Sequence, residues 1–344
     1  MKILHSADLH LDFPFSLKDP DQAQYLKEQL LSVPGKLSRL CRQEQCDLFL
    51  LAGDLFDGPW TQESFCALRD ALEDCGAEVF ISPGEQDHVN PESPYLRELW
   101  PANVHIFTQP RIESRFLEEL DCRVYGAGYR SADCTLLTEG LQRRGNARYH
   151  IGVLHADPTR PGSLSCDGCG LDYLALGHLH KTGQLRQGST LCAWSGCPMG
   201  HSFEETGNKG ALVVELEDGP LVRFVALDTP RFFAETTSVS ELPRLLPEAA
   251  SRDFYRITLL GEDSQPSLSE LYRQYSHLPH LELRDLRTAP ARLWGSVNSD
   301  TLEGLYFRHL KDAFDKADTE TGQIIRLAAM LSQQILDGQE VILP

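Results

Sequence analysis

The chain has 344 residues, of which 41% are hydrophobic and 24% charged, and its formal net charge at pH 7 is −18. This composition is ordinary for a folded globular protein and argues against a disordered or fibrous one, and the length favours two domains. No apolar run approaches the roughly 18 residues of a membrane-spanning helix, and the first residues do not resemble a signal peptide. We therefore expect a cytoplasmic protein with no membrane partner.

The excess of acidic residues extends along the whole chain. Residues 1–228 contain 33 acidic and 20 basic residues, and residues 229–344 contain 17 and 12. A protein that holds DNA through phosphate contacts alone normally carries a basic patch. If this protein acts on nucleic acid, the attraction must come from bound metal ions, local arginine clusters or a partner protein.

Strand and helix patterns alternate in the first half of the chain. Apolar runs predict strands at residues 2–6, 47–52 and 78–82, and apolar residues at three- and four-residue spacing predict helices at 21–45 and 61–75. Apolar strands with helices between them are typical of an α/β sheet that is covered on both faces. Further strands are predicted at residues 104–107, 122–125, 149–154, 173–176, 191–195, 211–216 and 222–226.

A domain boundary is expected near residues 228–231, where Thr-Pro follows the last of these strands. We predict one domain over residues 1–228 and a smaller α+β domain over 229–344. The second domain is predicted to contain strands at 254–260 and 281–286 with a helix at 267–275 between them. Two further helices are predicted after the second strand, at 300–317 and 320–336.

One face of the last predicted helix is apolar. Ile324, Ala328, Leu331 and Ile335 fall on a single stripe of that helix. We expect this stripe to pack on its own domain, and the alternative is that it binds a helix of a partner protein.

The ten cysteines are scattered, and without an export signal we expect reduced thiols. Cys166 and Cys169 form a CxxC pair beside glycines. A zinc site would need a second ligand pair, for which Cys192 and Cys197 are candidates. A single CxxC pair is weak evidence, so we favour a glycine-rich loop with incidental thiols.

Five short motifs place carboxylates or imidazoles directly after apolar strands. They are DLH at residues 8–10, GDLFD at 53–57, GEQD at 84–87, LHAD at 154–157 and GHLH at 177–180. In open α/β sheets, binding residues gather beyond the carboxyl ends of the strands. The candidate metal ligands are Asp8, His10, Asp54, Glu85, His155, His178 and His180.

This mixture of imidazole and carboxylate suits Mn²⁺, Zn²⁺ or Fe²⁺ and is poor for Ca²⁺. The candidates are too many for one ion, but they suit two ions about 3.5–4 Å apart that share a bridging carboxylate. Such a pair activates water and neutralises the charge of a phosphoester. Any one of these residues is better explained as an ordinary hydrogen-bonded group, whereas all five motifs in order favour a two-metal site.

These motifs resemble those of the calcineurin-like metallophosphoesterase superfamily. The segments MKILHSADLHLDFPF (1–15), LDYLALGHLHK (171–181) and PMGHSFEETGNKG (198–210) are similar to its bacterial DNA-repair exonuclease branch, which includes SbcD-type nuclease subunits and YhaO-like proteins. The resemblance is specific over residues 1–228 and weaker beyond them. It implies a two-sheet sandwich flanked by helices, with metals at one edge and a small C-terminal capping domain that binds partners.

The resemblance also implies roles for matching residues. Asp54 would bridge the two metals, with Asp8, His10 and His180 on the first ion and His155 and His178 on the second. It implies DNA phosphodiester bonds as the substrate, Mn²⁺ as the usual metal, and a coiled-coil SbcC-like ATPase subunit as the partner. Relatives often dimerise, so residues 24–31 and 62–72 are candidate faces for a homodimer.

The third motif departs from the family pattern, which is GNHD or GNHE. Glu85 stands at the position of the ligating Asn and Gln86 at that of the His which assists at the phosphate. Glu85 can bind a metal, but its charge lowers the Lewis acidity available to the substrate. Gln86 can donate a hydrogen bond but cannot transfer a proton, and such a loss typically costs about 10²–10⁴ in rate.

Other polar residues near these motifs are candidates for supporting roles. His88 is a candidate catalytic substitute beside Gln86, and the alternative is an exposed loop residue. Asp12 and Asp57 are candidates for orienting ligand imidazoles from outside the metal site, and turn capping is the alternative for Asp57. Asp87 keeps the family identity and is expected to brace its loop.

Three functions are therefore in competition. The preferred one is a metal-dependent phosphodiesterase acting on DNA ends, the exonuclease subunit of a DNA repair complex, with activity reduced by Glu85 and Gln86. The second is a phosphodiesterase for a small substrate. The third is a weakly active or inactive metal-binding subunit that holds DNA or an ATPase partner.

Overall fold

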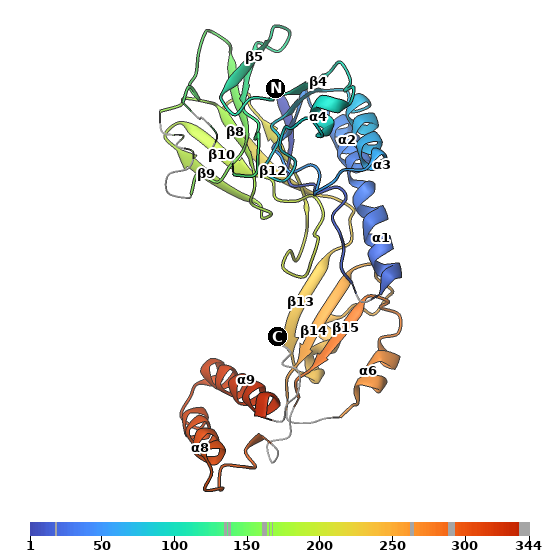
Figure 1. Cartoon of the computed structure of the whole chain (residues 1–344), viewed down its shortest axis with the longest axis vertical. Helices are drawn as coiled ribbons and strands as arrows, with labels where there is room; N and C mark the ends of the chain where they lie inside the picture. The colour runs from blue at the N-terminus through green and yellow to red at the C-terminus, as the bar shows by residue number, and fades with distance from the viewer. Residues whose placement is uncertain are drawn as a thin grey trace. The chain divides into compact units, whose positions relative to one another are not determined.

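The structure is a computed structural model, and it describes residues 1–17, 19–133, 136, 139–159, 164, 166, 168–261, 265–287 and 293–336. The chain divides into two compact units, Met1–Arg231 and Phe232–Pro344 (Figure 1). The division follows Arg231, at the end of the stretch 228–231 where the sequence predicted a boundary. Each unit is described below by itself.

The first unit contains a six-stranded sheet with the order β12-β11-β1-β2-β3-β4. Its strands are β1 (Lys2–Ser6), β2 (Leu48–Leu51), β3 (Glu78–Ile81), β4 (Val104–Ile106), β11 (Gly210–Glu215) and β12 (Leu221–Ala226). Strands β1 to β4 are parallel, whereas β11 runs antiparallel to β1. The carboxyl ends of β1, β2 and β3 therefore lie side by side at one edge.

A second six-stranded sheet has the order β5-β6-β7-β8-β10-β9. Its strands are β5 (Glu113–Leu117), β6 (Cys122–Gly126), β7 (Tyr149–His155), β8 (Tyr173–Gly177), β9 (Gly183–Gln187) and β10 (Thr190–Trp194). Strands β6, β7, β8 and β10 are parallel. The outer strands β5 and β9, which the sequence did not predict, have many exposed polar positions and so lack a continuous apolar run.

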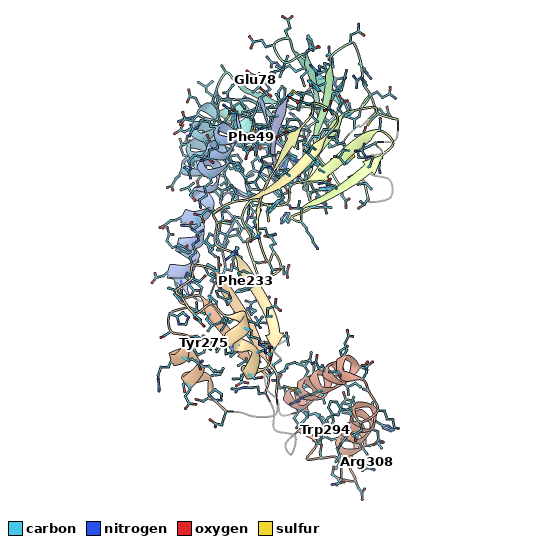
Figure 2. The ribbon with its side chains drawn as sticks, turned by 180° about the vertical axis from the view of Figure 1, so that it is seen from behind. Phe49, Glu78, Phe233, Tyr275, Trp294 and Arg308 are labelled. Atoms are coloured by element: carbon cyan, nitrogen blue, oxygen red, sulfur yellow. The ribbon has the colours of Figure 1, made fainter. Side chains whose placement is uncertain are left out.

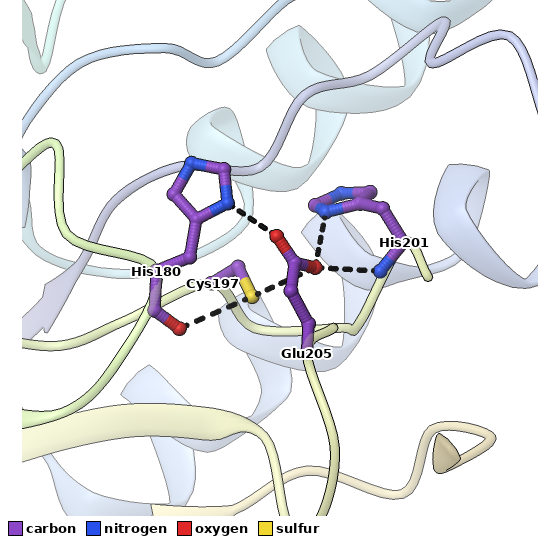
Figure 3. A group of neighbouring side chains, drawn as sticks. All are labelled: His180, Cys197, His201 and Glu205. Atoms are coloured by element: carbon purple, nitrogen blue, oxygen red, sulfur yellow. Dashed lines mark hydrogen bonds and ion pairs between the residues drawn. The ribbon is translucent and has the colours of Figure 1, made fainter. Parts of the chain in front are cut away.

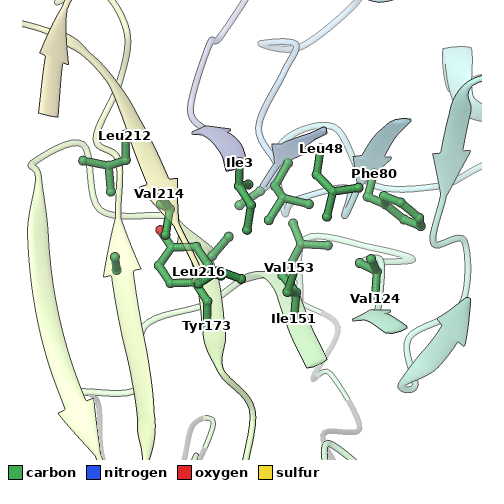
Figure 4. Packing of buried hydrophobic residues seen from close by; sticks show 14 of the residues in the cluster. Ile3, Leu48, Phe80, Val124, Ile151, Val153, Tyr173, Leu212, Val214 and Leu216 are labelled. Atoms are coloured by element: carbon green, nitrogen blue, oxygen red, sulfur yellow. The ribbon is translucent and has the colours of Figure 1, made fainter. Parts of the chain in front are cut away.

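The two sheets pack face to face around one hydrophobic core. Ile3, Leu48 and Phe80 of the first sheet share a buried cluster with Ile151 and Tyr173 of the second (Figure 4). The expected α/β two-sheet sandwich is confirmed. Because side chains alternate between the two faces of a strand, this packing fixes which residues of each sheet point inward.

Helices of the first unit are α1 (Pro20–Leu31), α2 (Val33–Glu44), α3 (Gln62–Glu73) and the short α4 (Pro94–Arg97). The single helix predicted over residues 21–45 is in fact two. It breaks at Ser32, whose backbone N–H bonds back to the carbonyls of Glu28 and Gln29, each at 3.2 Å. Pro34 in the first turn of α2 has no N–H to continue the α1 ladder, which explains the interruption.

The second unit begins with a parallel three-stranded sheet of β13 (Phe232–Thr237), β14 (Phe254–Leu259) and β15 (Leu281–Asp285). A short 3₁₀ turn η1 (Val239–Glu241) and the helices α5 (Leu242–Leu245) and α6 (Leu268–Gln274) accompany it. The helices α8 (Leu302–Phe314) and α9 (Thr319–Leu336) follow and contribute to a separate hydrophobic cluster, which also contains Leu286 and Leu293. Figure 2 shows Phe233 and Tyr275 around the sheet and Trp294 and Arg308 around the helical pair.

The apolar stripe predicted for the last helix faces outward. Ile324 is 65% exposed and Ile335 is 61% exposed, whereas Ala329 and Met330 are buried against Phe307 of α8. The prediction that the stripe packs on its own domain is therefore wrong. Leu310 of α8 and Leu327 of α9 are partly buried against the same cluster. No helix in the described part of the chain is long and apolar enough to cross a membrane.

Candidate metal centre

The five motifs meet at one edge of the sandwich. Three of them follow β1, β2 and β3 of the first sheet, and two follow β7 and β8 of the second. The loops after β1 and β2 are joined by backbone hydrogen bonds, from Asp8 N to Gly53 O at 2.9 Å and from His10 N to Asp54 O at 3.0 Å. The fold therefore brings together residues that are far apart in the sequence.

Four of the predicted ligands have a left-handed backbone conformation. Their φ angles are +54° at Asp8, +46° at His10, +51° at Asp54 and +84° at His178. A residue other than glycine pays about 1–3 kcal/mol for such a conformation, and these residues cluster at functional sites. The strain is consistent with turns that are selected to aim side chains at a common point.

Two motif glycines permit close packing around these side chains. A Cβ atom on Gly84 would overlap the carboxylate of Asp54. A Cβ atom on Gly177 would overlap the carbonyl oxygen of Ala52 and approach the ring of His155. Any larger residue at either position would push a predicted ligand out of place.

The candidate ligand atoms form a continuous cluster. Three sets of residues each offer ligand atoms that all lie within 4.8 Å of one another. They are Asp8, His10 and His180; Asp8, Asp54 and His155; and Glu85, His155 and His178. The middle set shares Asp8 with the first and His155 with the last, so the structure brings all seven predicted ligands together.

Three imidazoles are held in the same way, by a hydrogen bond at Nδ1. Nδ1 of His10 lies 3.3 Å from Asp57 Oδ1, and Nδ1 of His155 lies 2.9 Å from the carbonyl oxygen of Ala52. Nδ1 of His180 pairs with the carboxylate of Glu205. A partner at Nδ1 leaves Nε2 as the lone-pair nitrogen, and Nε2 of His10 and of His180 lie 3.1 Å apart. Asp57 thus occupies the orienting position proposed for it.

The electrostatics of the cluster favour positive charge. Burial would raise the pKa of Asp54, but His155 and His10 outweigh it and lower this pKa to about 2. Burial would lower the pKa of His155, but Asp54 and Asp8 raise it to about 10. The carboxylates thus create a field that attracts a proton or a metal cation.

Buried atoms without partners test whether the residues fit a metal. Within the described residues, Asp8 Oδ2 and His155 Nε2 are buried and have no hydrogen bond of good geometry, although Asp54 Oδ2 lies 3.3 Å from His155 Nε2. Leaving such atoms unpaired is costly, and a divalent cation would satisfy both. The oxygen and nitrogen donors suit Mn²⁺, Zn²⁺ or Fe²⁺. The residues present therefore fit two adjoining divalent ions.

The third motif separates into residues inside and outside this cluster. Glu85 lies inside it, with Oε1 3.4 Å from His178 Nδ1. Gln86 is exposed and reaches the cluster only through its backbone N–H, which donates to Asp54 Oδ1 at 2.9 Å. His88 points Nδ1 at the carbonyl oxygen of Glu85, at 3.1 Å. Gln86 and His88 instead line a cavity of about 430 Å³ together with Trp60.

Two other carboxylates in or near these motifs, those of Asp87 and Asp12, stabilise the local backbone. Asp87 is buried and accepts backbone hydrogen bonds from Leu55 and Gly84, both at 2.7 Å, so it braces the second and third motifs as expected. Asp12 accepts hydrogen bonds from Thr61 and Ser64 at the start of α3. The proposal that Asp12 orients an imidazole is therefore wrong, because its carboxylate caps a helix.

Two polar residues beside the cluster, His201 and Glu205, were not identified from the sequence. Glu205 contacts both His180 and His201, and Figure 3 shows this group with Cys197. His201 and Glu205 lie in the segment 198–210 that carried part of the family resemblance. Their spacing of four residues was the only local signal. Neither follows a strand end, which was the criterion that identified the other residues.

The four cysteines considered for a zinc site do not form one group in the described structure. Cys192 interacts with Cys166, Cys169 Sγ lies 3.1 Å from Thr190 Oγ1, and Cys197 lies beside Glu205. All four are buried, and none of them forms a disulfide. This arrangement agrees with the interpretation of incidental thiols.

A family model described as calcineurin-like phosphoesterase matches residues 1–182 of the chain. That region includes β1 to β8 and all five motifs.

Two proteins of Bacillus subtilis (strain 168) show sequence similarity. The chain is 32% identical over 249 residues to a protein named "Uncharacterized metallophosphoesterase YhaO", and 25% identical over 274 residues to the D subunit of the nuclease SbcCD. Each match covers 64% of this chain, and the two cover 59% and 67% of the respective relatives. The chain thus spans less than two thirds of the length of the first relative.

Solved structures with a related arrangement include TT1561 of Thermus thermophilus, at 12% identity and a TM-score of 0.40, covering 65% of this chain and 98% of that one. Another is the phosphoesterase Yfce from E. coli, at 15% identity and a TM-score of 0.34, covering 66% of this chain and 94% of that one.

Proposed function

The chain belongs to the calcineurin-like phosphoesterase family, and from this membership we propose that it is a metal-dependent phosphodiesterase that acts on DNA ends. In this proposal it is the exonuclease subunit of a DNA repair complex, and its catalytic rate is reduced by the residues of the third motif. Members of the family depend on two metal ions, and Mn²⁺ is the metal we propose.

One observation carries the proposal: the three ligand sets overlap at Asp8 and His155. Overlapping sets favour two ions that share ligands over two separate sites. We assign Asp8, His10 and His180 to the first ion and Glu85, His155 and His178 to the second. Asp54 belongs to the set between them and is assigned as the bridging carboxylate.

Two divalent cations, when bound, supply positive charge that polarises a phosphoester and activates water. The residues of the chain position the metal ligands and the hydrogen-bond donors. Burial acts in the opposite direction, but the neighbouring imidazoles lower the pKa of the Asp54 carboxyl, which favours the ionised form that a bridging ligand requires. The exposed amide of Gln86 can donate a hydrogen bond to a phosphoryl oxygen, and His88, which lines the same cavity, is the remaining candidate for proton transfer.

The assignment of DNA as substrate has two supports. One of the two relatives is named as part of a nuclease, and the cavity of about 430 Å³ beside Gln86 has the size of a pocket that holds a nucleotide. The net charge of −18 opposes DNA binding. The proposal therefore includes a partner that brings DNA to the site.

We propose a coiled-coil, SbcC-like ATPase as that partner, and the outward apolar face of α9 as the surface that binds it. Ile324 and Ile335 are both more than half exposed on that face, and an exposed apolar stripe of this kind suits a partner helix. A homodimer through the faces of α1 and α3 stays a prediction.

The test is hydrolysis by the purified protein in Mn²⁺, with linear DNA and bis-p-nitrophenyl phosphate as substrates. We expect hydrolysis of both by the wild type and none by Asp54→Ala. Asp70→Asn, which changes an exposed carboxylate on α3, is the matched control and should retain activity.

The other outcomes identify the competing functions. Hydrolysis of the small ester without any action on DNA would indicate a small-substrate phosphodiesterase. DNA binding without hydrolysis of either substrate would indicate an inactive subunit. Elemental analysis that finds no stoichiometric transition metal after growth in Mn²⁺ would contradict the metal centre itself.

A further inference from the structure

We infer that Glu205 is a positioning residue that holds His180 ready to bind a metal ion, and that His201 holds Glu205 in place. This inference rests on the metal centre of the proposed function. It adds two residues that lie outside the five motifs and touch no metal or substrate themselves.

His180 needs support more than the other candidate imidazoles. Its side chain is 35% exposed, compared with 16% for His178, 8% for His10 and 0% for His155. An exposed imidazole can rotate about its side-chain bonds, and ordering it when a ligand binds costs free energy. A fixed partner removes that cost before the metal arrives.

Glu205 supplies such a partner with one oxygen while its other oxygen is anchored. Oε1 accepts from His180 Nδ1. Oε2 lies 2.7 Å from the backbone N of His201, 2.9 Å from His201 Nδ1 and 3.6 Å from Cys197 Sγ (Figure 3). The Glu205 side chain is only 15% exposed, so solvent competes weakly for these bonds.

The same segment also holds the backbone of His180. Its carbonyl oxygen accepts from Lys209 Nζ at 3.2 Å and lies 3.5 Å from Cys197 Sγ. His201 Nε2 lies 3.3 Å from the carbonyl oxygen of Leu9, which stands between two predicted ligands of the first motif. The segment therefore connects His180 to the first motif through side chains on both sides.

The chemical effect is to select one tautomer of His180. A carboxylate at Nδ1 keeps the proton on that nitrogen and leaves the lone pair on Nε2, which faces His10. Asp57 acts on His10 with the same geometry. Each of the two imidazoles assigned to the first ion therefore has a carboxylate behind it, which also makes the ring a stronger donor to a metal.

The alternative is that His180, Cys197, His201 and Glu205 bind a metal of their own, because their ligand atoms lie within 4.8 Å of one another. The hydrogen bonds argue against it. Both oxygens of Glu205 and both nitrogens of His201 already have partners. A metal there would have to displace these bonds, whereas a positioning role uses all of them.

The test is calorimetric titration of the full chain with Mn²⁺ alone. We expect two sites in the wild type. In Glu205→Gln the affinity of one site should fall about 10- to 100-fold, the range typical for loss of a carboxylate behind a ligand histidine, while the other site keeps its affinity. Glu204→Gln changes the exposed neighbouring carboxylate and should leave both sites unchanged.

Titration with Co²⁺ gives a second measurement, because the visible absorption of the ion reports its ligand geometry. Glu205→Gln should alter the spectrum of one Co²⁺ and not of the other, and His201→Gln should act in the same direction with a smaller effect. Unchanged affinity at both sites in Glu205→Gln would overturn the inference. So would equal weakening of both sites together with a lower melting temperature, since that result indicates a general structural role.

These results separate the inference from the function on which it rests. A wild type that binds two Mn²⁺ ions beside an unaffected Glu205→Gln variant contradicts the role of Glu205 alone. A wild type that binds no Mn²⁺ contradicts the metal centre, and the role of Glu205 with it.

Discussion

At the scale of single residues, the third motif separates metal binding from catalysis. Glu85 lies in a ligand set with His155 and His178, whereas the side chain of Gln86 is exposed and lines the neighbouring cavity. An added carboxylate strengthens the hold on a cation but weakens the cation as a Lewis acid. An amide in place of an imidazole removes proton transfer. Under the proposed function, we expect both changes to lower the catalytic rate while the site still binds metal ions.

We predict that the double change Glu85→Asn and Gln86→His increases hydrolysis of bis-p-nitrophenyl phosphate in Mn²⁺. An imidazole that assists at the phosphate typically contributes about 10²–10⁴ in rate, so kcat should rise within this range. Loss of the Glu85 carboxylate should weaken Mn²⁺ binding at the second site. Steady-state kinetics at saturating Mn²⁺ would measure the first effect and calorimetry the second.

Gln86→Asn is the matched control, because it keeps an amide and should give no gain. A double variant with unchanged or lower kcat would contradict the proposed roles of these two residues. If DNA degradation were absent in the wild type and appeared only in the double variant, the natural protein would be a binding subunit rather than a nuclease.

At the scale of elements, the sequence predicted those strands and helices whose local pattern is strong. Strand β1 has the predicted bounds, and α3 begins after Thr61, which caps it. Strands β5 and β9 were missed because they lie at the edges of their sheet with exposed polar residues. Strand β13 was missed because half of its residues are exposed.

The candidate site was more predictable than the sheet edges. Most of its residues follow strand ends directly or by one turn, and the parallel order of the strands brings those ends together. Glu205 and His201 lie on an irregular segment, and only the folded chain shows that it returns to His180. Long-range contacts of this kind leave no periodic pattern in the sequence.

A buried histidine links the two sheets of the sandwich. His5 of β1 is fully buried, with Nδ1 2.8 Å from the hydroxyl of Tyr173 and Nε2 3.2 Å from the carbonyl oxygen of Leu176. A neutral ring with its proton on Nε2 satisfies both partners. Burial lowers the pKa of His5 from 6.5 to about 3, and the bond to Leu176 offsets only part of that effect.

We predict that this residue makes the protein acid-sensitive. The unfolded chain protonates His5 near pH 6.5 and the folded one only near pH 3. The stabilisation is therefore complete above pH 6.5 and is lost as the pH falls toward 3, by about 1.4 kcal/mol per pH unit from this group. Urea unfolding from pH 7.5 to pH 4.5 should show a steeper loss in the wild type than in His5→Gln.

The variant should be less stable than the wild type at pH 7.5, where the inter-sheet hydrogen bonds are intact, and the difference should shrink at low pH. His309→Gln, on the exposed surface of α8, is the control and should reproduce the wild-type slope. Equal slopes in the wild type and His5→Gln would show that another group causes the acid sensitivity.

At the scale of the whole molecule, charge and architecture together favour different roles for the two units, metal binding in the first and partner binding in the second. The net charge is −18, and acidic residues exceed basic ones in both parts of the chain. The first unit carries the candidate metal centre, and the second ends in a helical pair with an exposed apolar face. An acidic unit with the candidate metal centre and a unit with an exposed apolar helix face are consistent with the proposal of a subunit that works on DNA through a partner.

The last prediction concerns that helix face. Replacing Ile324 and Ile335 of α9 by lysine should abolish binding of the coiled-coil, SbcC-like ATPase proposed as the partner, because two charges would be placed in an apolar contact. Mn²⁺-dependent hydrolysis of bis-p-nitrophenyl phosphate should not change, since the candidate metal centre lies in the other unit. Gln323→Lys adds a charge at a neighbouring exposed polar position and should keep the partner. Retention of the ATPase by the double isoleucine variant would place the contact elsewhere on the chain, and a loss of ester hydrolysis would show that this face supports the catalytic unit rather than a partner.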